Sequence, residues 1–169
     1  MTSEEIVDKI KEWCYTQEPN TYNDHKLFQE QLVNFLREND WDAYKEYELE
    51  NYYKLSTQTK KIKEQVDFID IAAFGHNKKI VIEYDNTNIL KFKSICKLLY
   101  SKANFLIGIV HGKRGKPFLI FENSVKIKKT AKEIDVTDKS FFVLVIENKI
   151  AEWVHVCLLY TSPSPRDRS

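Results

Sequence analysis

Apolar residues recur at helical spacing in three stretches of the chain. The first covers 6–14, the second about 25–37 and the third about 89–101. Apolar positions three and four residues apart lie on one side of an α-helix. Asn23 or Asp24, residue types that favour helix starts, precede the second stretch. The pattern therefore predicts three amphipathic helices.

Strands are predicted where polar and apolar residues alternate or where a short run is wholly apolar. The segment 51–65 has no clean period, and we expect a loop or a ragged strand extension there. The order of the helices and strands predicts an α/β (α+β) fold, in which helices pack on a mixed central β-sheet. The predicted strands lie in 41–50, in a hairpin over 66–85, in 104–111, in 118–121 and in a final hairpin over 141–156.

The first predicted hairpin carries acidic residues inside apolar strands. A four-residue loop at 75–78 sets a register that brings Asp70 opposite Glu83, and the period of two places Asp85 on the face of Glu83. Asp67 falls on the opposite face from Asp70, and we expect it to be structural. Opposed like charges destabilise a sheet, and carboxyl groups this close need a cation or a proton. We therefore expect Asp70, Glu83 and Asp85 to hold a hard divalent metal ion, Mg²⁺ or Mn²⁺.

The formal net charge of +1 conceals an uneven charge distribution. Residues 1–53 contain 13 acidic and 5 basic side chains, whereas residues 54–132 contain 17 basic and 6 acidic ones. A lysine-rich middle around a small acidic cluster favours a polyanionic partner that meets a metal ion. A solvated lysine surface is the alternative. The basic residues that we expect to contact the sugar–phosphate backbone are Lys78, Lys79, Lys91, Lys97, Lys113, Arg114 and Lys116.

The composition disfavours several other classes of protein. Cys14 and Cys96 have no metal-ligand spacing, which fits a reducing, cytoplasmic setting. The N-terminal residues are acidic and polar, unlike a signal peptide, and the longest apolar run, 105–110, is too short to cross a bilayer. No His/Cys cluster in the sequence suggests zinc, and the four glycines form no phosphate-binding loop. We expect a cytoplasmic protein without a membrane partner.

The C-terminal run CLLYTSPSPRD, residues 157–167, resembles the translation of a transposase-type sequencing adapter. An authentic Ser/Pro-rich linker is the alternative. We expect residues 157–169 to be an adapter-derived artefact. Residues 1–156 are long enough for one ordinary domain, and we expect the native C-terminus to be missing.

The acids and elements described above, in their order, resemble the PD-(D/E)XK nuclease superfamily, which has a restriction-endonuclease-like fold. The resemblance covers about 25–111 as a helix, a three-stranded meander, a helix and a further strand. In that superfamily an Asp lies on the second core strand, an acidic-x-Lys signature lies on the third, and many members have a Glu on the preceding helix. The corresponding residues here are Asp70 in FIDIAAF, Glu83 in IVIEYD and Glu30 in HKLFQEQLVNFL.

The chain departs from this pattern at position 85, where Asp replaces the lysine of the signature. In some members the lysine comes from the following helix, which here offers Lys93 and Lys97 in KFKSICKLL. Lys93 is the preferred substitute because it lies nearer the strand end. The resemblance implies an Mg²⁺-dependent endonuclease that hydrolyses DNA phosphodiester bonds, with a homodimer as a candidate assembly. The implied catalytic residues are Asp70, Glu83, Asp85, Lys93 and Glu30.

Alternatives remain open for the site and for the function. Glu147 and Lys149 form a literal acidic-x-Lys with Asp135 or Asp138 as partner, although we expect a hairpin turn there because apolar alternation resumes after it. The first alternative function is a degenerate nuclease-fold module that binds nucleic acid without cutting it. The second is a protein-interaction domain whose acidic N-terminal third engages a basic partner.

Overall fold

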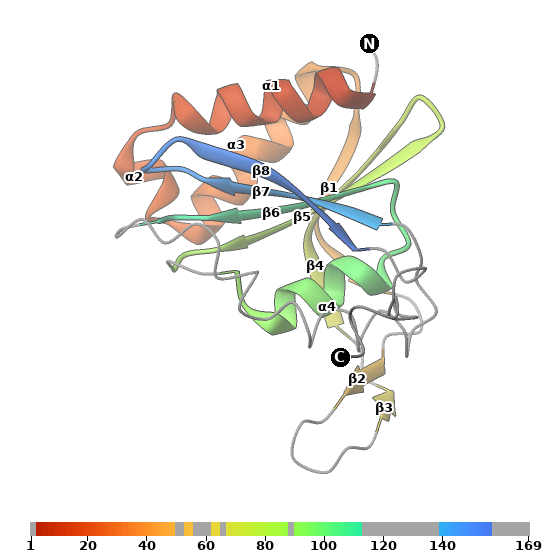
Figure 1. The fold of residues 1–169 in the computed structure, drawn as a ribbon. Helices are drawn as coiled ribbons and strands as arrows, with labels where there is room; N and C mark the ends of the chain where they lie inside the picture. Colours follow the sequence, from red (N-terminus) through yellow and green to blue (C-terminus); the bar gives the residue numbers. More distant parts are fainter. Residues whose placement is uncertain are drawn as a thin grey trace, which may run out of the picture.

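A computed structural model describes residues 3–49, 53–55, 62–64, 67–87, 90–112 and 139–156. They form an α/β fold in which a six-stranded mixed sheet lies between helices (Figure 1), as the sequence predicts. The elements are α1 (Ser3–Tyr15), α2 (Pro19–Tyr22), α3 (His25–Glu38), β1 (Asp42–Leu49), β2 (Tyr53–Leu55), β3 (Ile62–Glu64), β4 (Asp67–Gly75), β5 (Lys78–Asp85), α4 (Phe92–Tyr100), β6 (Phe105–Val110), β7 (Lys139–Val145) and β8 (Ile150–Val156).

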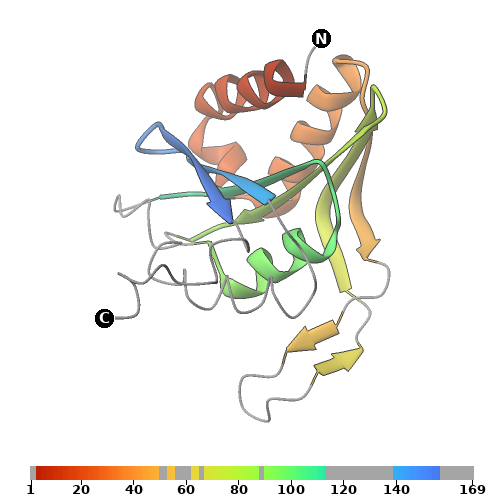
Figure 2. The same cartoon turned by 45° about the vertical axis from the view of Figure 1, so that its right-hand side comes forward.

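The main sheet has the strand order β1-β4-β5-β6-β7-β8. β1, β4 and β5 are antiparallel neighbours, β5, β6 and β7 are parallel, and β8 returns antiparallel to β7. Helices α1 and α3 lie on one side of this sheet, and α4 lies on the other (Figures 1 and 2). The small sheet of β2 and β3 projects from the main body in both views.

Each face of the main sheet has its own apolar core. On the first face, Ile10 of α1 and Phe28 of α3 belong to a cluster that also contains Ile82 of β5. On the second face, Ile95 of α4 belongs to a separate cluster with Val81 of β5. Successive strand residues thus enter different cores, as the pleat of a strand requires.

The β4–β5 hairpin has the predicted register but a tighter turn. Phe74 pairs with Lys79, and Gly75 pairs with Lys78, so that only His76 and Asn77 remain in the turn. Both have left-handed backbone conformations, with φ of 52° and 60° respectively, which is typical of a type I′ turn. The predicted loop includes Gly75 and Lys78. In the structure these two residues pair with each other, which leaves the register of the strands unchanged.

The remaining predictions of secondary structure divide into three groups. The predicted helices correspond to α1, α3 and α4, although α4 begins only at Phe92. The segment 51–65 is not simply a loop, because it contains the paired strands β2 and β3. The predicted strand at 118–121 and the expected artefact at 157–169 lie outside the described residues. Within the described part of the chain, no helix combines the length and apolar composition that crossing a bilayer requires.

Candidate carboxylate site

Two buried carboxyl groups meet where the β4–β5 hairpin comes apart. The last backbone pair of this ladder is Ile71 with Ile82, one position short of Asp70 and Glu83. Beyond it, Glu83 Oε2 accepts a hydrogen bond from Asp70 N at 3.2 Å, and Asp70 Oδ2 accepts one from Tyr84 N at 2.7 Å. The two carboxylates therefore accept hydrogen bonds from Asp70 N and Tyr84 N in place of carbonyl groups of the paired strand. The structure brings Asp70 and Glu83 together, although the paired ladder ends one position before them.

The alternation of β4 changes at this point. Ile69 belongs to the core on the α4 side, whereas Ile71 belongs to the core on the α1 and α3 side. On the neighbouring strand β1, Glu46 lies between the paired positions on either side of Asp70 and has φ of 51°. A local irregularity of both strands thus turns Asp70 toward α3, while Glu83 faces α4. The two carboxyl groups meet across the strand end.

Gln29 and His25 of α3 hold Asp70 from one side. Gln29 Nε2 donates to Asp70 Oδ1 at 3.1 Å and to Glu46 Oε1 at 2.9 Å. His25 Nε2 lies 3.4 Å from Asp70 Oδ2 and 3.1 Å from Tyr84 O. The imidazole also stacks on the Tyr84 ring, with the centroids 5.7 Å apart.

Neither Gln29 nor His25 was predicted from the sequence as a site residue. The predicted helix residue, Glu30, instead faces solvent and pairs with Lys45 Nζ at 2.9 Å. The two positions differ because one residue step turns a helix by about 100°. A signal was available, since Gln29 is a polar residue inside the buried stripe that contains Phe28 and Leu32.

Lys97 of α4 neutralises the site from the other side. Lys97 Nζ lies 3.2 Å from Glu83 Oε1 and 3.4 Å from Asp67 Oδ1, and its side chain is only 13% exposed. Lys93 Nζ lies 3.8 Å from Asp67 Oδ2 with its side chain 54% exposed. The lysine beside the carboxyl pair is therefore Lys97 and not the predicted Lys93. Asp67 faces α4, opposite to Asp70 as predicted, yet it shares Lys97 with Glu83.

Asp85 does not join the carboxyl pair. Its Oδ2 accepts a hydrogen bond from Lys91 N at 2.8 Å, and its Oδ1 accepts one from Ser94 Oγ at 3.0 Å. Burial raises the pKa of Asp85 despite these hydrogen bonds. Among the described residues, no group of three His, Cys, Asp or Glu side chains is arranged to hold a metal ion. The predicted convergence of three carboxylates is therefore corrected to a pair, because the start of α4 engages the third.

The pKa values of the two carboxyl groups shift in opposite directions. Burial raises the pKa of Glu83, and the hydrogen bond and negative charge of Asp70 raise it further, whereas Lys97 opposes the rise. Burial also disfavours the ionised form of Asp70, but hydrogen bonds from His25, Glu83 and Tyr84 N outweigh it and lower the pKa of Asp70. The proton of the pair is therefore favoured on Glu83 over Asp70, as expected for adjacent carboxyl groups. The hydrogen bond to Asp70 raises the pKa of His25.

The pair fits a hard divalent cation in its chemistry. Asp70 and Glu83 offer carboxylate oxygens, the ligands that Mg²⁺ prefers. Glu83 Oε1 is buried and accepts no hydrogen bond in the described structure, although Lys97 pairs with it. A cation could therefore replace the proton of Glu83, and the other positions of an octahedron would require water or substrate oxygens.

The basic residues predicted to contact DNA are distributed over several places. Lys78 and Lys91 are exposed, and Lys97 belongs to the carboxylate site. Lys79 lies over two aromatic rings of the sheet. The other three predicted contacts lie outside the described residues, namely Lys113, Arg114 and Lys116.

The alternative acidic-x-Lys lies in the turn between β7 and β8. Residues 146–149 form this turn, which confirms the predicted hairpin, and Lys149 has φ of 49°. Glu147 Oε1 lies 3.6 Å from His111 Nε2 and 3.5 Å from Tyr22 Oη. The proposed partners Asp135 and Asp138 lie outside the described residues.

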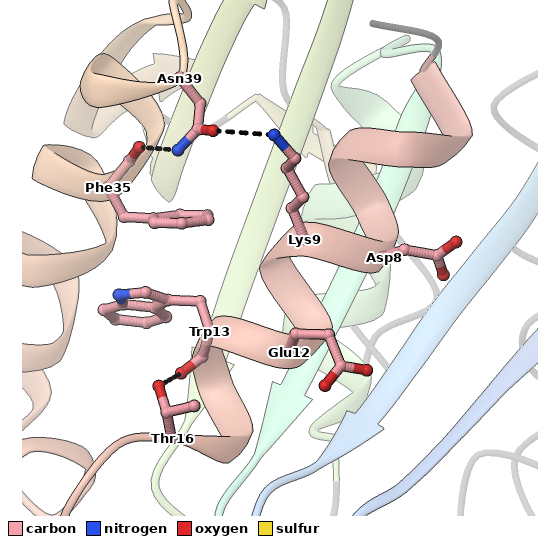
Figure 3. Close-up of a pocket in the computed structure, with 7 residues that line it drawn as sticks. All are labelled: Asp8, Lys9, Glu12, Trp13, Thr16, Phe35 and Asn39. Atoms are coloured by element: carbon pink, nitrogen blue, oxygen red, sulfur yellow. Dashed lines mark hydrogen bonds between the residues drawn. The ribbon is translucent and has the colours of Figure 1, made fainter.

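A groove of about 450 Å³ lies between α1 and α3 (Figure 3). Trp13 and Phe35 stack in it, with ring centroids 5.5 Å apart. Lys9 Nζ spans the groove to Asn39 Oδ1 at 3.4 Å. Its polar lining therefore makes contacts within the protein, and the groove is separate from the carboxyl pair.

Comparison with known proteins gives no relative: no protein-family model matches the chain, and neither a curated protein nor a solved structure matches it.

Proposed function

We propose that this chain is a metal-dependent nuclease that hydrolyses phosphodiester bonds of DNA. The observation that carries the proposal is the meeting of Asp70 and Glu83 at the open end of a hairpin, with Lys97 Nζ 3.2 Å from Glu83. The order α3, β1, β4, β5, α4 and β6 also supports it, because it is the order expected from the resemblance to PD-(D/E)XK nucleases.

The residues of the site would divide the chemistry between them. Asp70 and Glu83 would hold Mg²⁺ or Mn²⁺, which would polarise the scissile phosphate and lower the pKa of a bound water. Glu83 must lose its proton for this, and Lys97 stabilises the resulting carboxylate. The same ammonium group is placed to stabilise negative charge that develops on the phosphate. Gln29 and His25 keep Asp70 in position.

Cleavage of supercoiled plasmid DNA with Mg²⁺ or Mn²⁺ tests the proposal. Asp70→Asn and Glu83→Gln should each abolish cleavage. Lys97→Met should lower the rate about a hundredfold or more, by analogy with the loss of one electrostatic stabiliser elsewhere. Glu30→Gln is the matched control, because Glu30 is exposed and pairs with Lys45 away from the site. Wild-type cleavage by the Asp70→Asn variant would contradict the proposal.

A second candidate is a nuclease-fold module that binds DNA without cutting it. Asp85 in the signature position and its engagement with α4 favour this candidate. Titration calorimetry separates the two, since a catalytic protein should bind Mg²⁺ or Mn²⁺ and lose that binding in Asp70→Asn. DNA binding without either metal binding or cleavage would favour the second candidate.

Cutting both strands of a duplex would need two sites, so we expect a homodimer on DNA, which sedimentation would detect.

A further inference from the structure

Three aromatic side chains and one lysine form a patch on the α4 side of the sheet, at its β1 edge. We define this aromatic patch as Tyr44, Tyr47, Phe74 and Lys79. Ring centroids are 6.2 Å apart for Tyr44 and Tyr47, 6.3 Å for Tyr44 and Phe74, and 5.5 Å for Tyr47 and Phe74. Tyr44 pairs with Ala72, which belongs to the core on the α4 side, and this pairing fixes the face.

The aromatic patch offers ring surface to solvent together with a positive charge. Tyr44 is 41% exposed, although it is a large residue on a sheet. Lys79 Nζ lies 5.4 Å from the Tyr47 centroid and 5.6 Å from the Phe74 centroid, and it donates to Ser101 O at 3.2 Å. The lysine is thus held over the rings by the end of α4, where cation–π attraction also favours it.

A hollow of about 540 Å³ adjoins the aromatic patch at the hairpin turn. Phe74 and Lys79 line both the patch and the hollow, and Lys78, Asn77 and Asn104 provide further polar groups. Asp42 also lines the hollow, and its carboxylate accepts a hydrogen bond from Tyr44 Oη at 2.6 Å. Two lysines against one aspartate favour an anionic ligand, and the ring surface favours an aromatic one.

The aromatic patch and the carboxyl pair lie along the same strands. Tyr47 pairs with Ile69, the residue before Asp70. Phe74 lies four residues beyond Asp70, which corresponds to about 13 Å along a strand. The aromatic patch therefore lies about four residues along β4 from the carboxyl pair, although Asp70 itself turns toward α3.

We propose that the aromatic patch binds unpaired nucleotides of single-stranded DNA. Bases stack on the exposed ring of Tyr44 and on the partly buried ring of Phe74, and Lys78 and Lys79 contact the phosphates. Aromatic side chains with adjacent lysines bind single strands in this way because every base has a stacking face, whereas the bases of a duplex already stack on each other. The inference rests on the proposed nuclease function. It restricts the proposed substrate to DNA that has an unpaired segment next to the cleavage site.

Binding measured without a divalent metal tests the inference independently of cleavage. A fluorescein-labelled oligothymidine strand is titrated with the full chain in EDTA, and unlabelled duplex of equal length serves as competitor. Tyr44→Leu and Phe74→Leu should each weaken single-strand binding about tenfold. Trp153→Leu is the matched control, because Trp153 is 47% exposed on β8 at the opposite edge of the sheet. Circular dichroism and thermal melting establish that each variant is folded.

The outcomes separate this inference from the proposed function. Single-strand affinity that is unchanged in both folded variants, or a duplex that competes as well as the single strand, overturns the inference and leaves the nuclease proposal intact. Reduced single-strand affinity in the variants supports the inference even if plasmid cleavage is never observed. A folded wild-type chain that binds no single strand overturns it as well.

Discussion

At the scale of single residues, the site is a pair of carboxyl groups held between an imidazole and a lysine ammonium group. Asp70 faces His25, and Glu83 faces Lys97. Such a pair is tolerated without a metal ion because one proton and the flanking side chains reduce its charge. The protonation of Glu83 and the position of Lys97 each lead to a measurable consequence.

Glu83→Gln should stabilise the metal-free protein at alkaline pH. Burial, followed by the hydrogen bond and charge of Asp70, raises the pKa of Glu83 from 4.5 to about 10. Because the folded state keeps a proton that the unfolded state loses, the wild-type free energy of unfolding should fall as pH rises through this range. Glutamine needs no proton, so at pH 8 the variant should be more stable by about 2 kcal/mol or more.

Urea unfolding of both proteins at several pH values measures this difference. The two curves should approach each other toward pH 4, where Glu83 is protonated in both states. A wild-type stability that does not fall between neutral and alkaline pH relative to the variant would contradict the assignment of the proton to Glu83.

Lys97→Met should lower the free energy of unfolding by about 1–3 kcal/mol, because it leaves the buried Glu83 without its cationic partner and leaves the half-buried Asp67 with Lys93 alone. Lys93→Met is the matched control, since Lys93 is largely exposed and one turn away on the same helix. It should change stability by less than about 0.5 kcal/mol. Chemical unfolding measures the stability of both variants. Equal losses of stability in Lys97→Met and Lys93→Met would contradict the assignment of the stabilising contact to Lys97.

The sequence could predict Asp70 and Glu83 but not their side-chain partners. Hairpin register follows from local rules of turn and period, and it identified the pair correctly. Gln29, His25 and Lys97 reach the pair from two helices, so their roles depend on helix rotation relative to the sheet. One residue of error in that rotation exchanged Gln29 for Glu30, and one helical turn exchanged Lys97 for Lys93.

At the scale of elements, the β4–β5 turn and the start of α4 fix the position of the site. The tight turn sets the register that brings Asp70 to Glu83. The start of α4 is attached to β5 through Asp85, whose carboxylate binds Lys91 N and Ser94 Oγ. Both features can be tested by substitution.

Asn77→Ala should destabilise the protein by about 1 kcal/mol, because alanine is strained at the φ of 60° that asparagine adopts here. Asn77→Gly should retain or slightly increase stability, since glycine reaches this region without strain. Urea unfolding compares the two. Equal stability of the alanine and glycine variants would show that the turn conformation contributes nothing to stability.

Asp85→Ala should destabilise the protein by about 1–3 kcal/mol, because it removes the acceptor for two donors at the start of α4. Amide hydrogen exchange should accelerate in the first turn of α4. If the carboxyl pair binds Mn²⁺, its affinity by calorimetry should be nearly unchanged. A large loss of Mn²⁺ affinity with normal exchange in α4 would show instead that Asp85 is a metal ligand.

Element prediction succeeded where one period dominated and failed where two influences competed. The stripes of α1 and α3 are long enough to determine each helix. In contrast, the pattern of α4 extends to residue 89, but the helix begins at Phe92, where the backbone reaches the Asp85 carboxylate. No glycine or proline near Glu46 or Asp70 indicates the irregularity in the sequence. It could not be predicted, because it depends on the pairing of two neighbouring strands.

At the scale of the whole molecule, the sheet separates two apolar cores and exposes different chemistry at its two edges. The β1 edge has the aromatic patch and lies next to the strands of the carboxyl pair. Residues 54–132 contain 17 basic and 6 acidic side chains, although the formal net charge of the whole chain is only +1. This arrangement leads to a prediction about how ionic strength affects DNA binding.

DNA affinity should fall as salt concentration rises. Four to six phosphate contacts would give a loss of about a hundredfold or more between 50 and 200 mM salt, because bound cations are released from DNA. Fluorescence anisotropy at several salt concentrations measures the slope. Lys79→Gln should reduce that slope by about one contact, and Lys45→Gln, which alters an exposed pair with Glu30, is the control. An affinity independent of salt would favour a protein partner instead.

The attachment of α4 through Asp85 has an evolutionary consequence. The resemblance to PD-(D/E)XK nucleases implies that a lysine at position 85 would supply the cation itself, whereas Asp85 secures the helix that supplies one from position 97. A lineage can move between these solutions only if both positions change together, since one substitution alone removes the cation or duplicates it. Among descendants of the same gene, we therefore expect lysine at position 85 to be accompanied by an uncharged residue at 97, and acidic residues at 85 by lysine at 97.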